Sequence, residues 1–193
     1  GQPLAVRREA LLHLGYGAAA SGDDTARARA SSALLDMSAE DPVAESALRG
    51  LIPATHGVPE SGEVDFFSRL LERALSGTRR ALALQALQTF VASRDDLPKR
   101  RPALLTTLDA RLLAPIESDP AGFAGNGDAS ARAFALAALW HSARHREAAG
   151  DGAPAARLKT LLATLLSAET DPSVRAQLSA YLEAPPASSD SAP

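Results

Sequence analysis

The sequence predicts an all-α fold of stacked helical hairpins, and three observations support this prediction. The 193 residues are 46% hydrophobic but only 4% aromatic, and most of the apolar content is Ala and Leu, which favour helices. Apolar residues recur at helical spacing, as at Leu158, Leu161, Leu162, Leu165 and Leu166. A short sequence pattern, in which a turn or capping residue precedes an Ala-rich helix, recurs along the chain. Because Val and Ile are scarce, a β-sheet is not expected.

The first four helices are expected at residues 3–20, 24–38, 42–56 and 62–76. Residues 21–24, Ser-Gly-Asp-Asp, break the chain and then offer an N-cap to the second helix. Asp41 stands before Pro42, which suits a capping Asp followed by Pro in the first helical turn, where its missing N–H costs nothing. The fourth helix carries a wide apolar stripe that begins at Phe66 and Phe67.

The remaining helices are expected at 78–93, 99–114, 128–148, 153–168 and 172–184. Gly77 and Thr78 are expected to end one helix and cap the next. A Gly-, Asp- and Pro-rich insertion, residues 116–127, precedes the helix at 128–148. The Pro/Ser/Ala-rich tail at 185–193 lacks apolar anchors, so it is expected to be disordered.

Five of the expected helices begin with similar residues, which indicates a repeat. The aligned starts are Val6, Val43, Arg79, Ala131 and Val174, so successive copies are 37, 36, 52 and 43 residues apart. The long interval contains the insertion at 116–127. One such unit cannot bury its apolar faces alone, so neighbouring units are expected to stack.

The chain resembles the HEAT-repeat family in this pattern. In that family a first helix ends in Leu, a short Asp-containing turn follows, and Val-Arg-x-x-Ala opens the second helix. Residues 165–176 match this pattern best, and residues 34–43 match next, although Ala44 stands where the family usually has Arg. The resemblance covers residues 3–184 and implies one repeat domain over 1–184. The implied fold is a right-handed α–α superhelix, or solenoid, of about four hairpins plus a leading helix.

The resemblance also implies structural roles for the motif residues. The Asp of each copy would cap its second helix and the Arg would tie the turn to the next repeat. The residues that carry the motif here are Asp41, Val43, Asp128, Arg132, Asp171, Val174 and Arg175. The first copy, at residues 3–14, has no partner helix, so either the chain starts within a repeat of a longer solenoid or its first helix acts as a cap.

Composition and charge exclude several classes of function. The net charge of −3 argues against a dedicated nucleic-acid surface. The absence of Cys excludes disulfides, zinc–thiolate sites and thiol nucleophiles. No apolar run reaches the roughly 18–20 residues that span a bilayer, so membrane insertion is not expected. Cytoplasm and periplasm fit equally well. Arg greatly outnumbers Lys, which suggests a GC-rich bacterial genome more than dedicated anion binding.

Two groups of residues are weighed as binding sites, beside one weak metal candidate. Phe123 and Asn126 lie in the Gly-rich part of the insertion, where Phe123 either packs onto the stack or anchors a partner. Lys99, Arg100 and Arg101 form the densest basic cluster, which suits a phosphate or an acidic partner, although a solvated helix start is the preferred interpretation. His141 and His145 share one helix face at metal-ligand spacing, but no third ligand accompanies them, so a solvated helix end is the preferred interpretation.

The function expected from these observations is a non-catalytic protein-interaction scaffold whose partner is another protein or peptide. No cofactor is expected, and no residue set suited to catalysis stands out. Two alternatives remain open: a helical-repeat domain that holds a small molecule or lipid in its concave groove, and a HEAT-like nucleic-acid-binding domain, which the acidic balance disfavours.

Overall fold

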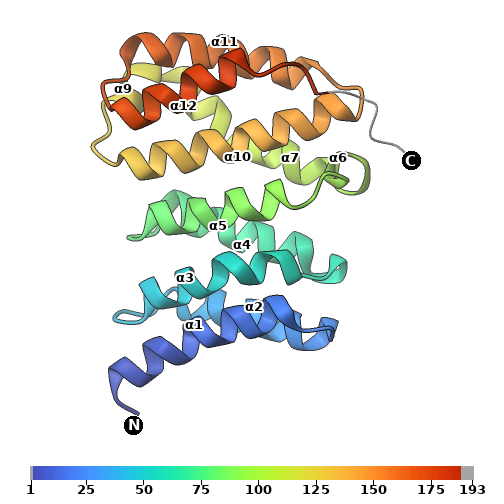
Figure 1. Cartoon of the computed structure of the whole chain (residues 1–193), viewed down its shortest axis with the longest axis vertical. Helices are drawn as coiled ribbons and strands as arrows, with labels where there is room; N and C mark the ends of the chain where they lie inside the picture. The colour runs from blue at the N-terminus through green and yellow to red at the C-terminus, as the bar shows by residue number, and fades with distance from the viewer. Residues whose placement is uncertain (1, 188–193) are drawn as a thin grey trace. The chain divides into compact units, whose positions relative to one another are not determined.

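A computed structural model of the chain describes residues 2–187, and its regular structure in that range is entirely helical (Figure 1). The prediction of an all-α chain is therefore confirmed for these residues. The chain divides into two compact units, Gly1–Ser93 and Arg94–Pro193. The right-handed superhelical path of the whole chain stays a prediction.

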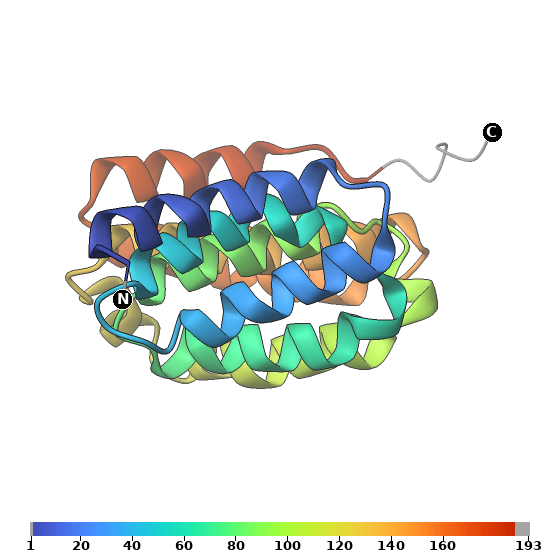
Figure 2. The same ribbon diagram turned by 90° about the horizontal axis from the view of Figure 1, so that it is seen from below.

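The N-terminal unit consists of a leading helix and two hairpins. Helices α1 and α3 lie side by side, α3 also contacts α5, and α2 and α4 form a second layer beside them (Figures 1 and 2). Two short 3₁₀ turns, η1 and η2, link α3 to α4. The elements are α1 (Leu4–Ala20), α2 (Asp24–Met37), α3 (Ala44–Ala54), η1 (Thr55–Gly57), η2 (Glu60–Gly62), α4 (Glu63–Ser76) and α5 (Arg80–Ala92).

The core of the N-terminal unit lies between the two layers. Phe66 and Phe67 of α4 both contact the ring of Phe90 on α5, with ring centroids 5.5 and 5.9 Å apart, respectively. Phe67 and Phe90 are fully buried, so this aromatic cluster joins the second hairpin internally. The apolar stripe expected on the fourth helix is therefore the core face of α4.

The N-caps predicted from the sequence are only partly confirmed in the N-terminal unit. Asp23 caps α2, because its carboxylate accepts hydrogen bonds from the N–H groups of Thr25 and Ala26. The predicted cap at Asp41 is wrong. The chain makes a turn at residues 39–43, α3 begins only at Ala44, and Asp41 accepts no hydrogen bond there. The predicted Thr78 cap is also wrong, since α5 begins at Arg80 without a side-chain cap.

The C-terminal unit contains a segmented helical region followed by three long helices. Helix α10 packs against α11, α11 against α12, and the short α9 against α11 (Figure 1). The element η3 is a π-helical stretch that continues α7 into α8. The elements are α6 (Leu97–Arg100), α7 (Pro102–Leu108), η3 (Asp109–Leu113), α8 (Ala114–Ser118), α9 (Pro120–Ala124), α10 (Ala129–Ala148), α11 (Ala153–Ala168) and α12 (Pro172–Glu183).

Two prolines explain where this unit departs from the expected helices. The helix predicted at 99–114 is interrupted at Arg101, whose extended φ of −140° reflects the restriction that Pro102 places on its predecessor. The insertion at 116–127 is largely helical rather than a Gly-rich loop. Asp119 caps α9 by accepting the N–H of Gly122, and Pro120 occupies the first turn of that helix.

The segment after α12 lies against α10. Arg144 donates a hydrogen bond to the carbonyl of Pro185, and the N–H of Ala187 donates to Glu147 at 2.9 Å. The disorder predicted for 185–193 therefore does not hold for residues 185–187, while 188–193 lie outside the described residues. A polar anchor on α10, invisible in the local composition, holds this segment.

Candidate binding surfaces

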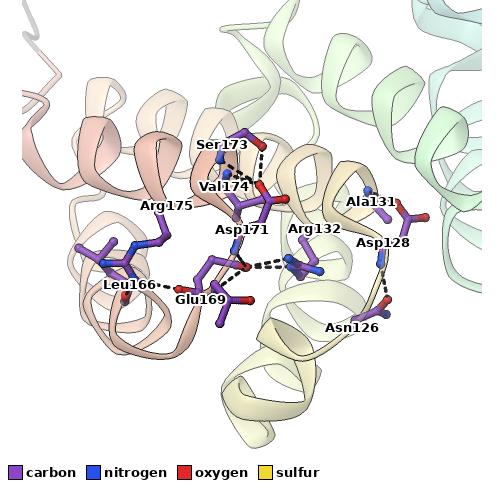
Figure 3. A network of polar contacts seen from close by, with 11 residues as sticks. Asn126, Asp128, Ala131, Arg132, Leu166, Glu169, Asp171, Ser173, Val174 and Arg175 are labelled. Atoms are coloured by element: carbon purple, nitrogen blue, oxygen red, sulfur yellow. Dashed lines mark hydrogen bonds and ion pairs between the residues drawn. The ribbon is translucent and has the colours of Figure 1, made fainter.

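The repeat-motif residues of the C-terminal unit lie in and around a polar network whose centre is a buried ion pair (Figure 3). The guanidinium of Arg132 on α10 donates two hydrogen bonds, of 2.8 and 2.7 Å, to the carboxylate of Glu169 at the end of α11. Their side chains are only 5% and 2% exposed. Glu169 also accepts the N–H groups of Thr170 and Asp171. Because this ion pair is bidentate and further hydrogen-bonded, it is a fixed structural link and offers no free group to a ligand.

The turn into α12 is held by the remaining motif residues. The Asp171 carboxylate accepts the N–H groups of Ser173 and Val174, and this cap starts α12. Arg175 donates to the carbonyls of Leu166 and Glu169, both at 2.8 Å. Arg175 thus ties the turn to the end of its own hairpin, whereas Arg132 ties the same turn to α10. Asp128 likewise caps α10 through the N–H of Ala131.

The electrostatics of this network keep its carboxylates ionised. Burial raises the pKa of Glu169, but the hydrogen bonds from Arg132, Asp171 and Thr170 outweigh this effect, so the pKa lies below its ordinary value. The hydrogen bonds from the Ser173 side chain and from the backbone of Val174 lower the pKa of Asp171. Both shifts favour the charged forms that the network requires.

The two histidines of α10 lie close together, as their spacing predicts. The ring centroids of His141 and His145 are 6.3 Å apart. Burial lowers the pKa of His141, and the neighbouring His145 lowers it further, so His141 is neutral at pH 7. Among residues 2–187 no group of three or more His, Cys, Asp or Glu side chains is arranged to hold a metal ion.

The structure does not bring the two predicted partner-binding groups together. Asn126 accepts the N–H of Asp128, directly before α10 begins. Lys99 instead lines a cavity with Arg146 and Ala149, at the other end of α10. A helix of 20 residues is about 30 Å long, so the two groups are separate surfaces.

In each group, one residue is also held by contacts within the fold. Arg100 pairs with Asp96 through contacts of 2.5 and 3.1 Å, which leaves the exposed Lys99 and Arg101 as the available cations of the basic cluster. The hydrogen bond from Arg100 is the largest effect that lowers the pKa of Asp96. Phe123 is partly buried on α9. A role of either group in binding a partner stays a prediction.

The helical insertion creates a groove against α11 that the sequence did not reveal. This insertion groove has a volume of about 450 Å³ and is lined by Glu117, Pro120, Arg157, Thr160, Leu161 and Thr164. Arg157 of α11 pairs with Glu117 of α8, and its Nε donates to Oε1 of Glu117 at 2.7 Å. Exposed Thr residues at i and i+4 on an otherwise Leu-rich helix were the only signal in the sequence.

Helix α1 also carries exposed apolar residues. Four of its larger apolar residues remain exposed, Leu4, Val6, Leu14 and Tyr16, with Tyr16 66% exposed. Only Leu11, Gly15 and Ala18 of this helix are buried.

No protein-family model, no curated protein and no solved structure matches the chain in comparisons with known proteins. Within the part of the chain that the structure describes, no helix has the length and apolar character needed to cross a membrane.

Proposed function

We propose that the chain is a non-catalytic protein-interaction scaffold with HEAT-like repeats, and that it holds an extended peptide segment of a partner in the insertion groove. The observation that carries this proposal is the groove itself: an open cavity of about 450 Å³ whose walls come from α8, α9 and α11. A cleft of this size between packed helices suits a few side chains of a bound segment.

The groove is more apolar than its residue types suggest. The hydroxyl of Thr160 donates to the carbonyl of Ala156, and that of Thr164 donates to the carbonyl of Thr160. Both hydroxyls are therefore used within α11, so the two Thr side chains contribute mainly their methyl groups to a partner. With Pro120 and Leu161 they line an apolar strip, which suits the apolar side chains of a peptide.

The walls of the groove are held in place before any partner binds. The cap at Asp119 fixes the start of α9, and the Glu117–Arg157 pair links α8 to α11 across the groove. The hydrogen bond that Arg157 donates to Glu117 raises the pKa of Arg157. A preformed cleft loses less conformational freedom on binding than a flexible loop would. The charged pair also gives the apolar strip a polar end that can orient a bound segment.

The experiment that tests this function is selection of peptides from a displayed random library on the immobilised chain. Thr164→Arg and Thr160→Arg fill the groove with a long side chain, whereas Ala163→Arg places the same side chain on the exposed surface of α11 beside it. Selected peptides are expected to bind the wild type and Ala163→Arg equally and to bind both Thr variants at least about tenfold more weakly, equivalent to about 1.4 kcal/mol.

The proposal fails if the selection yields no peptide that binds the wild type. It also fails if the selected peptides bind Thr164→Arg as tightly as Ala163→Arg, because their site would then lie elsewhere. Far-UV circular dichroism of all three variants excludes a loss of folding as the reason for weaker binding.

A further inference from the structure

The N-terminal unit contains a polar cavity. It has a volume of about 230 Å³ and lies between the turn that joins α2 to α3 and the turn that joins α4 to α5. The charged and hydroxyl-bearing residues that matter here are Asp41, Arg73, Thr78 and Arg79. This cavity belongs to a different unit from the insertion groove, so the inference is independent of the function proposed above.

The two arginines of this cavity have no carboxylate partner among the residues that the structure describes. Four of the nine arginines of the N-terminal unit have a carboxylate partner: Arg7 pairs with Glu40, Arg27 with Asp24, Arg49 with Glu45 and Arg69 with Asp36. Arg73 and Arg79 have no hydrogen-bond or ion-pair partner for their guanidinium groups among residues 2–187. Ten guanidinium N–H donors thus border one cavity without an acceptor.

The other polar groups of the cavity do not neutralise these arginines. The hydroxyls of Ser38 and Ser76 donate to carbonyls of their own helices, at 2.6 and 2.8 Å. Asp41 lines the same cavity but forms no ion pair with Arg73 or Arg79 within 4 Å. The free charges therefore sum to about +1, from two guanidinium groups and one carboxylate.

The backbone holds this arrangement through Gly77. Its N–H donates to the carbonyl of Arg73 at 2.9 Å, and a Cβ at this position would lie 2.5 Å from that oxygen. The tight turn that carries the chain from Arg73 back to Arg79 therefore requires glycine. Two cationic side chains six residues apart thus line one cavity in a turn of fixed shape.

We propose that this cavity binds a carboxylate of a partner protein, supplied by an Asp or Glu side chain. Guanidinium groups form two parallel hydrogen bonds with a carboxylate, and two of them can hold one carboxylate from both sides. Asp41 makes the cavity selective. A net charge of about +1 matches a monoanion, while Asp41 repels the second negative charge of a phosphate dianion.

The experiment is a titration of the ¹⁵N-labelled chain at constant ionic strength, followed by NMR. The probes are the blocked peptide acetyl-Gly-Glu-Gly-amide, the same peptide with Gln in place of Glu, and inorganic phosphate. The Glu peptide is expected to shift the amide signals of Gly77, Thr78 and Arg79 and to saturate, whereas the Gln peptide is expected to leave them in place.

Variants separate a specific site from general attraction of anions. Arg73→Gln and Arg79→Gln are each expected to weaken binding of the Glu peptide about tenfold or more, while Arg29→Gln, an exposed arginine of α2 outside the cavity, leaves it unchanged. Asp41→Asn is expected to strengthen phosphate binding at least about threefold, because it removes a repelling charge.

Three results would overturn the proposal. Signal shifts that never saturate, or that persist in Arg73→Gln, indicate non-specific screening of charge. Phosphate binding tighter than the Glu peptide in the wild-type chain would assign the cavity to phosphate groups instead. The amide spectra of the variants report at the same time whether each remains folded, so a loss of binding is not confused with a loss of structure.

Discussion

Gly15 of α1 and Gly50 of α3 bring the backbones of their two helices into direct contact. A Cβ on Gly15 would lie 1.9 Å from the carbonyl oxygen of Gly50, and a Cβ on Gly50 would lie 2.3 Å from the carbonyl oxygen of Leu11. Neither position has room for a side chain unless the helices move apart. The leading helix is thus attached to its unit by a narrow strip with glycine at its centre.

This contact predicts opposite effects for two glycines of the same helix. Gly15→Ala is expected to destabilise the N-terminal unit by several kcal/mol, about 2–4, because α1 must shift away from α3. Gly17→Ala is expected to stabilise it by up to about 1 kcal/mol, because nothing lies within 4 Å of the new Cβ and Ala favours a helix. Urea unfolding followed by circular dichroism measures both. Equal effects at the two positions would show that α1 does not pack closely on α3.

A second prediction compares Asp residues that cap a helix with an Asp residue that does not. Asp128→Ala and Asp171→Ala are each expected to cost about 1 kcal/mol, because each removes the acceptor for the first N–H groups of a long helix. Asp41→Ala is expected to change the free energy of unfolding by less than about 0.5 kcal/mol, because its side chain caps nothing. Thermal unfolding of the three variants tests this. A comparable loss at Asp41 would contradict the described turn.

The buried pair predicts strong coupling between two distant positions. Arg132→Met leaves the Glu169 carboxylate buried without its cation and is expected to cost about 3–5 kcal/mol. The double variant Arg132→Met/Glu169→Leu is expected to be less destabilised than the sum of the two single variants, because it leaves no unpaired charge. A double-mutant cycle from urea unfolding measures the coupling. Additive effects would mean that the two side chains do not interact.

The lowered pKa values of Glu169 and His141 predict a loss of stability in acid. The unfolded chain binds a proton at each group before the folded chain does, so the free energy of unfolding falls with the pH. The His141 contribution begins to be lost as the pH falls through about 6.5, and that of Glu169 below about 4.3, the ordinary values of these groups. Urea unfolding from pH 8 to pH 3 is the measurement. His141→Gln is expected to flatten the curve between about pH 7 and pH 5 and to leave the acid branch, which Glu169→Gln should reduce.

Local signals in the sequence predicted the local structure well. Asp23, Asp128 and Asp171 cap the helices that follow them, because a cap depends only on residues within one turn. The same reasoning failed at Asp41, where the chain continues through a turn before α3 starts. It also missed the segmentation at Arg101 and the helix at Pro120, although the proline rules contain both signals.

Sequence patterns could not predict contacts between residues that lie far apart in the chain. The motif singled out Arg132 but gave no role to its partner Glu169, which lies 37 residues away. The insertion groove likewise depends on how α9 meets α11. The sequence did not mark Arg73 and Arg79 as candidate binding residues, because one lies near the end of a helix and the other lies just before the next helix. Only the folded turn shows that neither has an acceptor.

Trp140 makes the C-terminal unit optically distinct. It is the only tryptophan in the chain, its side chain is 8% exposed, and its ring stacks on Tyr181 at a centroid distance of 4.7 Å. Its fluorescence therefore reports the unfolding of the C-terminal unit, whereas circular dichroism sums the helices of both units. Comparing the fluorescence and circular dichroism curves therefore distinguishes the unfolding of the N-terminal unit from that of the C-terminal unit, and no added label is needed.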